Sequence, residues 1–253
     1  MSGLLRSEVR KVITTKLWWG MLLGAMALAA LGVVAQIATN GLKNNPAPPL
    51  TDPATQRSVL SSATGGYIFA VVVGIILITT EYRHFTSRPT FLLEPRRGRV
   101  IVAKLLVAAV VGLLYGVVCV GVVVGITVPW LAAKGIALGW TTNGLIVVMV
   151  GAAAAVAIFA VVGVGAGALY RNQVTAVIVA LAYLFVVEPL VAVIPVIKEG
   201  YRFLPGAASS ALTGVARNQV LLLPNWAGGL VLLGWGLFFA VAGWVLTVRR
   251  DVP

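Results

Sequence analysis

The chain has 253 residues, of which 60% are hydrophobic and only 10% are charged. A soluble globular domain carries roughly 25% charged residues, so this composition excludes a soluble protein and indicates an integral membrane protein. The net charge of +12 lies mainly in short connecting segments, where Lys and Arg mark the cytoplasmic side of a membrane protein. We therefore expect no nucleic-acid partner.

Recurring apolar runs of bilayer length predict an all-α integral membrane protein with one domain and six transmembrane helices. The runs are continuous rather than alternating, which argues against a closed β-barrel. Most of the Lys and Arg then fall on the side that holds both termini, so we expect cytoplasmic termini in a plasma-membrane protein. The predicted spans cover residues 17–38, 65–80, 100–128, 144–169, 174–194 and 226–248.

Residues 1–16 are basic and carry apolar side chains at helical spacing, which predicts an amphipathic helix at the cytoplasmic interface. The alternative is the charged start of a signal peptide. The apolar run that follows, 17–38, is too long for that, and no good cleavage site comes after it.

Two external segments differ in pattern. Residues 39–63 are rich in Pro and Asn, so we expect an irregular loop. Residues 195–224 hold short apolar pieces broken by Pro and Gly, which predicts short external half-helices that never cross the bilayer. They are interpreted as a gate or as a passive cap, and the gate candidates are Tyr201, Phe203, Leu204 and Pro205.

Small and charged residues inside the spans have structural and functional interpretations. Glycines at four-residue spacing predict close helix packing, with a moving interface as the alternative; they include Gly112, Gly116, Gly121 and Gly125 in the third span and Gly163, Gly165 and Gly167 in the fourth. Glu188, followed by Pro189, is a carboxylate at membrane depth. It is paired structurally, lines a translocation path, or couples protons.

Residues 81–104 comprise the loop between the second and third spans and the first residues of the third, and they contain six of the 19 basic residues. A basic loop of this kind can bind anionic lipid. It also contains Ser87-Arg88-Pro89-Thr90, a helix-start pattern, and then apolar Phe91, Leu92 and Leu93. An apolar anchor with arginines around it suits a cytoplasmic protein partner.

The string TTEYRHFTSRPTFLLEPRRGRVIVAKLL resembles the loop between the second and third spans of ABC-2 type transporter permeases, particularly actinobacterial ones. The shared pattern is E-Y-R, then T-x-R-x-T-F-L, a Pro, basic residues and A-K-L. Phe85 stands where Gly is usual, and Glu94 where a small or hydroxylated residue is common. Glu188-Pro189 and the string LPGAA at 204–208 are similar to the family's fifth span and the helices after it.

The resemblance implies the transmembrane subunit of an exporter that works as a dimer with itself or a related permease. Separate ATPase subunits would dock on a coupling helix within residues 81–99 and would carry the ATP and Mg, so this chain needs no cofactor. The implied contact residues are Glu81, Arg83, Thr86, Arg88, Pro89, Thr90, Phe91, Leu92, Pro95, Arg96 and Arg97. The substrate path would lie near spans one, two and five, with Glu188 and Pro189 as tentative members.

Two other classes compete with a transporter. One is a membrane scaffold or assembly protein whose basic loop binds lipid or a partner that is not an ATPase. The other is a lipid-modifying enzyme, which is disfavoured because no cluster of catalytic side chains is evident. The chain has no GxxxxGK[ST] phosphate loop, and its single Cys119 and single His84 suggest no metal site.

Overall fold

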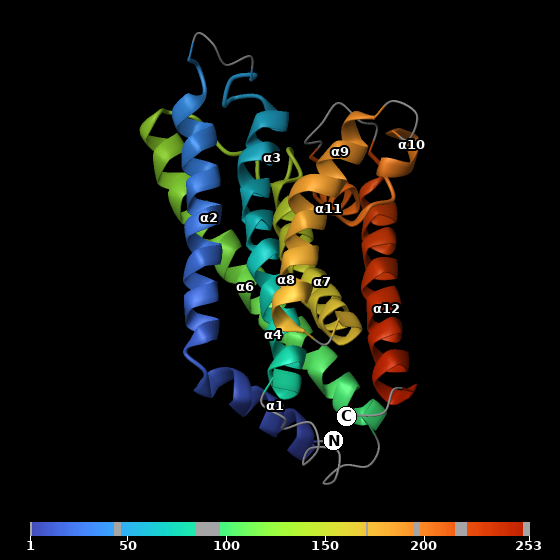
Figure 1. The fold of residues 1–253 in the computed structure, drawn as a ribbon. Coiled ribbons are helices and arrows are strands. Elements are labelled where there is room, and N and C mark those ends of the chain that lie inside the picture. Colours follow the sequence, from blue (N-terminus) through green and yellow to red (C-terminus); the bar gives the residue numbers. More distant parts are fainter. Residues whose placement is uncertain are drawn as a thin grey trace.

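The computed structural model of the chain describes residues 2–42, 47–83, 97–170, 172–194, 198–215 and 222–249. Over these residues the expected all-α membrane fold is confirmed, because six helical segments are long and apolar enough to cross a bilayer. The start of α1 (Ser2–Thr14) and the end of the last helix lie at the same end of the bundle (Figure 1). We call this the proximal end and the opposite one the distal end.

The long helices are α2 (Leu17–Thr39), α4 (Tyr67–Arg83), α6 (Arg97–Ala133), α7 (Leu145–Tyr170), α8 (Gln173–Ala182) and α12 (Asn225–Arg249). The shorter elements are α3 (Pro53–Ser61), the 3-10 turn η1 (Ser62–Gly66), the π-helical turn η2 (Tyr183–Val187), α9 (Glu188–Val193), α10 (Lys198–Tyr201) and α11 (Pro205–Thr213). The fifth span is thus α8, η2 and α9 in succession, while α10 and α11 lie between the last two spans.

The second span begins earlier than the sequence predicts. The expected irregular loop over 39–63 is wrong for residues 53–61, which form α3 and continue through η1 into α4. Asp52 starts this helix: its Oδ1 accepts hydrogen bonds from the backbone N–H of Ala54, at 2.7 Å, and of Thr55, at 3.4 Å. Pro53 occupies the first helical position, where its missing N–H is no loss.

The helices beside the basic loop also have shifted ends. Backbone helix extends to Arg83 in α4 and starts again at Arg97 in α6, inside the predicted loop of 81–99. At its other end α6 passes the predicted end of the span at residue 128 and continues through Pro129 to Ala133. A proline removes one backbone hydrogen bond, and near a helix end one further turn still forms.

The centre of the bundle is α7, which contacts α3, α4, α6, α8, α11 and α12. Its glycines and alanines let neighbouring backbones approach closely. A methyl group added to Gly74 of α4 would overlap the carbonyl oxygen of Ala160, and one added to Gly163 of α7 would overlap that of Val71. The two helices therefore meet backbone to backbone at this crossing.

The predicted packing role of the glycines holds for only part of the third span. Gly112 and Gly116 of α6 face α7, where an added Cβ would come within 2.7 Å of Ala160 and Ala153 respectively. Gly121 and Gly125 have open space beside them. Gly116 and Gly121 are five residues apart, so the second pair of glycines lies on another face of α6, where both are exposed.

Gly74→Ala is expected to destabilise the bundle by about 1–3 kcal/mol, because the new methyl group forces α4 and α7 apart. The measurement is thermal unfolding of the purified chain in detergent or nanodiscs. Gly121→Ala is the matched control and should leave the melting temperature unchanged or raise it, since alanine favours a helix. Equal melting temperatures for Gly74→Ala and wild type would contradict the close crossing.

Candidate functional site

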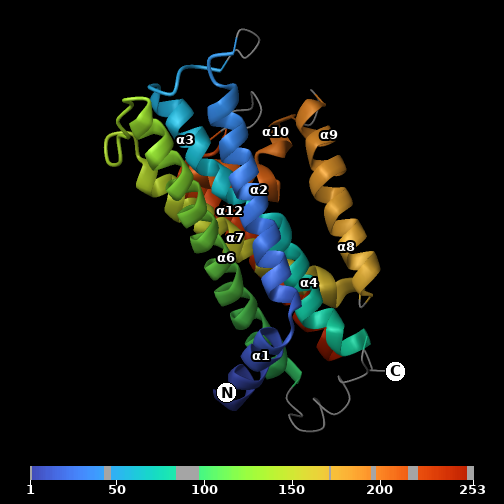
Figure 2. The same ribbon diagram turned by 90° about the vertical axis from the view of Figure 1, so that its left-hand side faces the viewer.

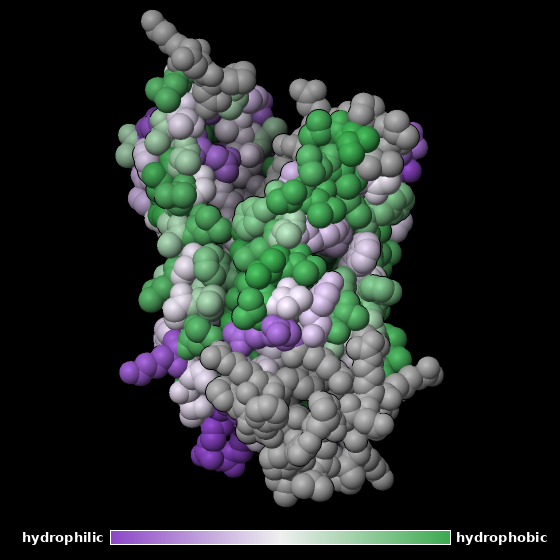
Figure 3. All heavy atoms as spheres, in the orientation of Figure 1, coloured by the Kyte–Doolittle hydropathy of each residue, from purple (hydrophilic) through white to green (hydrophobic). Residues whose placement is uncertain are grey.

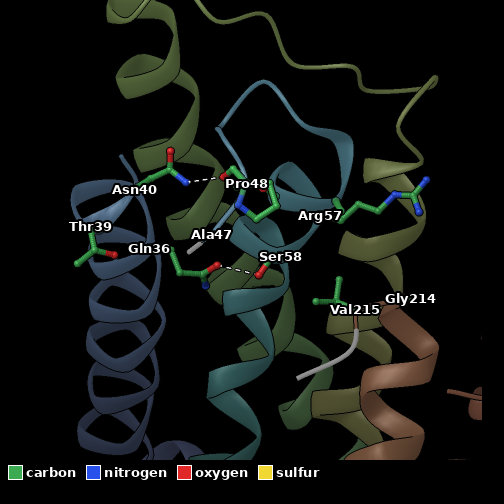
Figure 4. A pocket seen from close by; sticks show the side chains of 11 residues that line it. Gln36, Thr39, Asn40, Ala47, Pro48, Arg57, Ser58, Gly214 and Val215 are labelled. Atoms are coloured by element: carbon green, nitrogen blue, oxygen red, sulfur yellow. Dashed lines mark hydrogen bonds between the residues drawn. The ribbon is translucent and has the colours of Figure 1, made fainter. Parts of the chain in front are cut away.

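A polar groove opens in the distal half of the bundle. It consists of two adjoining cavities of about 490 Å³ each, which share Gln36, Ser58 and Val215. Figure 3 shows hydrophilic side chains in the hollow at the distal end, on the side of α2 and α3. Figure 4 shows the residues that line the more distal cavity. We call the two cavities together the distal groove.

Gln36 is the central polar residue of the groove. Its side-chain oxygen accepts from the Ser58 hydroxyl at 2.9 Å, and its Nε2 donates to the Ser62 hydroxyl at 2.7 Å. These contacts join α2 to α3 and η1. The sequence signal was a glutamine inside an otherwise apolar first span, which sequence reasoning passed over although a polar group at that depth usually has a function.

Apolar side chains also line the groove. Phe185 of η2 and Val215 line it, together with Ile68 at the start of α4. Among the described residues that line the groove there is no Asp or Glu, and Arg57 supplies a cation. The surface therefore suits a neutral or anionic polar group attached to an apolar body.

A second amide fixes the distal wall. Gln56 is 2% exposed, and its Nε2 donates to the carbonyls of Leu50, at 3.2 Å, and Ala137, at 3.1 Å. Its oxygen accepts from the side chain of Asn143 at 2.8 Å. The Nε of Arg57 donates to the Asn143 carbonyl at 2.5 Å. The start of the second span is thereby held against the turn between α6 and α7.

Glu188 lies beside the groove but lines neither cavity. It is 4% exposed, and its Oε1 accepts from the backbone N–H groups of Gly206, at 2.6 Å, and Ala207, at 3.1 Å. These donors belong to the first turn of α11, where the capping residue Leu204 offers no side-chain hydrogen bond. The carboxylate thus caps α11 from another helix, which matches the structural interpretation of the sequence.

Glycine at 206 is required by this contact, because an added Cβ would stand 2.6 Å from the Glu188 oxygen. Pro189 follows the π-helical turn η2, whose altered hydrogen bonding lies one residue before Glu188. The π-helical turn thus lies directly before the carboxylate that caps α11.

The four gate candidates lie together around the start of α11. Tyr201 is buried at the end of α10, and Phe203 is 46% exposed. Leu204 and Pro205 form the entry to α11. The Phe203 carbonyl accepts from the indole N–H of Trp235 at 2.7 Å, which ties this corner to α12. Whether the corner opens and closes stays a prediction.

Most residues predicted to bind a partner lie outside the described residues: Thr86, Arg88, Pro89, Thr90, Phe91, Leu92, Pro95 and Arg96. Glu81 and Arg83 belong to the last turn of α4, and Arg97 begins α6. The structure thus places the two ends of this segment at the proximal end of the bundle (Figure 1).

A buried ion pair lies beside those two ends. The carboxylate of Glu8 in α1 meets the Nζ of Lys104 in α6 at 2.7 Å, and both side chains are 1% exposed. Lys11 contacts the other Glu8 oxygen at 2.6 Å, and Lys104 also donates to the Leu77 carbonyl of α4 at 3.2 Å. Sequence reasoning named Lys104 but missed Glu8.

The missed signal was the position of Glu8, four residues from both Leu4 and Val12 and so on the apolar face of α1. Burial there acts to raise the pKa of Glu8. The charges and hydrogen bonds of Lys104 and Lys11 outweigh burial and hold that pKa below its ordinary value.

A family model described as ABC-2 family transporter protein matches residues 4–187. The chain belongs to this family. The match confirms the resemblance seen in the sequence, and it includes α1, the groove residues of α2 and α3, and Lys104. It ends one residue before Glu188, so α9 to α12 lie beyond it. A search of curated proteins returned no match.

Glu188→Leu is expected to lower the stability of the chain by about 1–3 kcal/mol, because two buried N–H groups of α11 lose their acceptor. Glu188→Gln keeps an acceptor oxygen and should fall between wild type and the leucine variant. Thermal unfolding and the rate of trypsin cleavage at Arg202 are the measurements. A melting temperature and a cleavage rate for Glu188→Leu that equal those of wild type would rule out a capping role.

The stabilisation due to Glu8 is expected to be lost in acid. Because folding lowers its pKa, the contribution is complete above the unfolded pKa and disappears as the pH falls through the folded one. The melting temperature of wild type should exceed that of Glu8→Gln at about pH 7, and the difference should shrink towards about pH 3. A difference that stays constant with pH would contradict an ionised Glu8.

Proposed function

We propose that this chain is the permease subunit of an ATP-driven ABC-2 exporter in the plasma membrane, with the proximal end in the cytoplasm. The observation that carries the proposal is the family match over residues 4–187 together with a polar groove at membrane depth inside that region. The basic residues of α1 and of the segment 83–99 support the orientation, because Lys and Arg concentrate on the cytoplasmic side.

The distal groove is the proposed path for the cargo. Its walls come from the first, second and fifth spans, as the family resemblance implied, and both polar Gln36 and apolar Phe185 line it. A cargo with a polar head and an apolar body suits such walls. Glu188 then shapes the path indirectly, by holding α11 in place.

A second permease chain would complete the path. Figure 2 shows α8 and α9 at the edge of the bundle, with α8 beside α4, and Phe185 of the same span lines the groove. Exposed apolar residues cover the outer face of this span, including Val174, Ile178 and Leu190. A copy of the chain, or a related permease, placed against this edge would enclose the groove.

The motor is proposed to be a separate ABC ATPase with bound ATP and Mg. The segment between α4 and α6 is the proposed docking element, with Phe91 and Leu92 as apolar anchors and arginines around them. Its ends lie at the proximal end, where a cytoplasmic subunit has access.

The double variant Arg88→Glu/Phe91→Ala is expected to weaken co-purification with the ATPase subunit severalfold, because it removes the anchor and reverses a rim charge. Membrane insertion should be unchanged. The matched control, Lys134→Glu/Trp140→Ala, makes the same kind of change at the distal end and should bind as wild type does. If the first variant recovers as much ATPase as wild type does, the docking assignment is contradicted. Recovery of lipid alone would favour a scaffold.

A further inference from the structure

The ion pair of Glu8 and Lys104 joins three elements that are distant in sequence. Glu8 belongs to α1, Lys104 to α6, and the carbonyl that Lys104 also contacts, Leu77, to α4. The two charged residues are 96 positions apart in the chain. This contact ties an interfacial helix to the bundle through charge, in addition to apolar packing.

The position of this contact relative to the proposed docking segment is informative. Leu77 lies about two turns before the end of α4, and Lys104 lies about two turns after the start of α6. The segment 84–96 connects these two helix ends. A displacement of the segment would therefore act on the parts of α4 and α6 to which Glu8 attaches α1.

A second set of contacts continues from α1 into α2. The indole N–H of Trp18 donates to the Ile13 carbonyl at 3.3 Å, and the Tyr115 hydroxyl of α6 donates to the Trp18 carbonyl at 2.5 Å. The same helix α2 carries Gln36 into the distal groove. The contacts thus run from the proximal ends of α4 and α6, through α1, to one wall of the groove.

We propose that Glu8 and Lys104 are positioning residues that make α1 and the proximal ends of α4 and α6 move as one body, transmitting displacement of segment 84–96 to α2 and the groove. This role rests on the proposed function. Glu8 is suited to it because it is the only acidic residue of α1, so Lys104 meets a carboxylate of that helix in a single register of α1 against α6.

The first test measures whether the pair fixes α1. Spin labels are attached to Ile13→Cys in α1 and Val174→Cys in α8, both exposed positions, on a chain in nanodiscs that carries Cys119→Ala. The distance distribution should be narrow with native Glu8 and broad in Glu8→Gln. Arg10→Gln, an exposed charge on the same helix, is the control and should stay narrow.

Lys11→Met keeps the buried pair and removes only the half-exposed partner, so it should broaden the distribution less than Glu8→Gln. Lys104→Met should act as Glu8→Gln does. A narrow distribution in both Glu8→Gln and Lys104→Met would overturn the proposal, because α1 would then be held without the pair.

The second test uses the chain assembled with the ATPase that co-purifies with wild type. Labels at Thr39→Cys in α2 and Val193→Cys in α9 report the width of the groove, with and without ATP and vanadate. In wild type, trapping the nucleotide should change this width. In Glu8→Gln the ATPase should still bind and hydrolyse ATP, while the change in width falls severalfold.

The outcomes separate this proposal from the proposed function. A full change in groove width in Glu8→Gln, with the ATPase bound, overturns the transmission role and leaves the permease assignment intact. Failure of any ATPase to bind the wild-type chain overturns both the proposed motor and the transmission role. A merely structural defect would instead reduce ATPase binding and the width change in the same proportion.

Discussion

The contact on which the proximal end depends is the one between Glu8 and Lys104. An amphipathic helix held only by its apolar face can slide and rotate at an interface, because hydrophobic contact is not directional. Two opposite charges at 2.7 Å, each 1% exposed, remove that freedom. Taking charges out of water is costly, and breaking such a pair costs about 3–5 kcal/mol because one charge stays buried alone. On the proposal above, the pair specifies one arrangement of α1 rather than adding much net stability.

The distal half is organised by a different constraint, the close packing around α7. Backbone contact at Gly74 and Gly163 draws α4 against α7, whereas α2 and the fifth span stay at the periphery. The groove lies between these peripheral elements. Its polar lining requires hydrogen-bond partners at membrane depth, and Gln36, Ser58 and Ser62 supply them to one another. The proposed cargo path therefore lies beside, and not within, the closely packed centre of the bundle.

The features of the fold that depend on patterns repeated along the chain could be predicted from the sequence. Hydropathy and length predicted six spans, and the spacing of apolar residues predicted α1, since both depend on local periodicity. The family resemblance was readable from a single string of residues. The start of the second span was not, because Pro and Asn around 39–53 masked the cap at Asp52. Gly121 and Gly125 repeat the four-residue spacing, yet they lie on an exposed face of α6, because five residues separate Gly116 from Gly121.

The candidate site was harder to predict from the sequence than the fold, because its contacts join residues far apart in the chain. Glu188 was recognised as unusual, but its partners at 206 and 207 are set by how α11 folds back. Glu8 looked like an ordinary acid in a basic helix, and only the tertiary structure places it against Lys104. Single polar residues on apolar faces, such as Glu8 and Gln36, were the signal that sequence reasoning undervalued.

The most direct test is a double-mutant cycle on the pair, with unfolding free energies measured reversibly in mixed micelles for wild type, Glu8→Gln, Lys104→Met and the double variant. Each single variant leaves one buried charge without its partner, and the double variant removes both charges. The account predicts that the double variant is destabilised by less than the sum of the single variants, with a coupling above about 1 kcal/mol. Additivity within about 0.5 kcal/mol would show that the two residues act independently and would contradict the account.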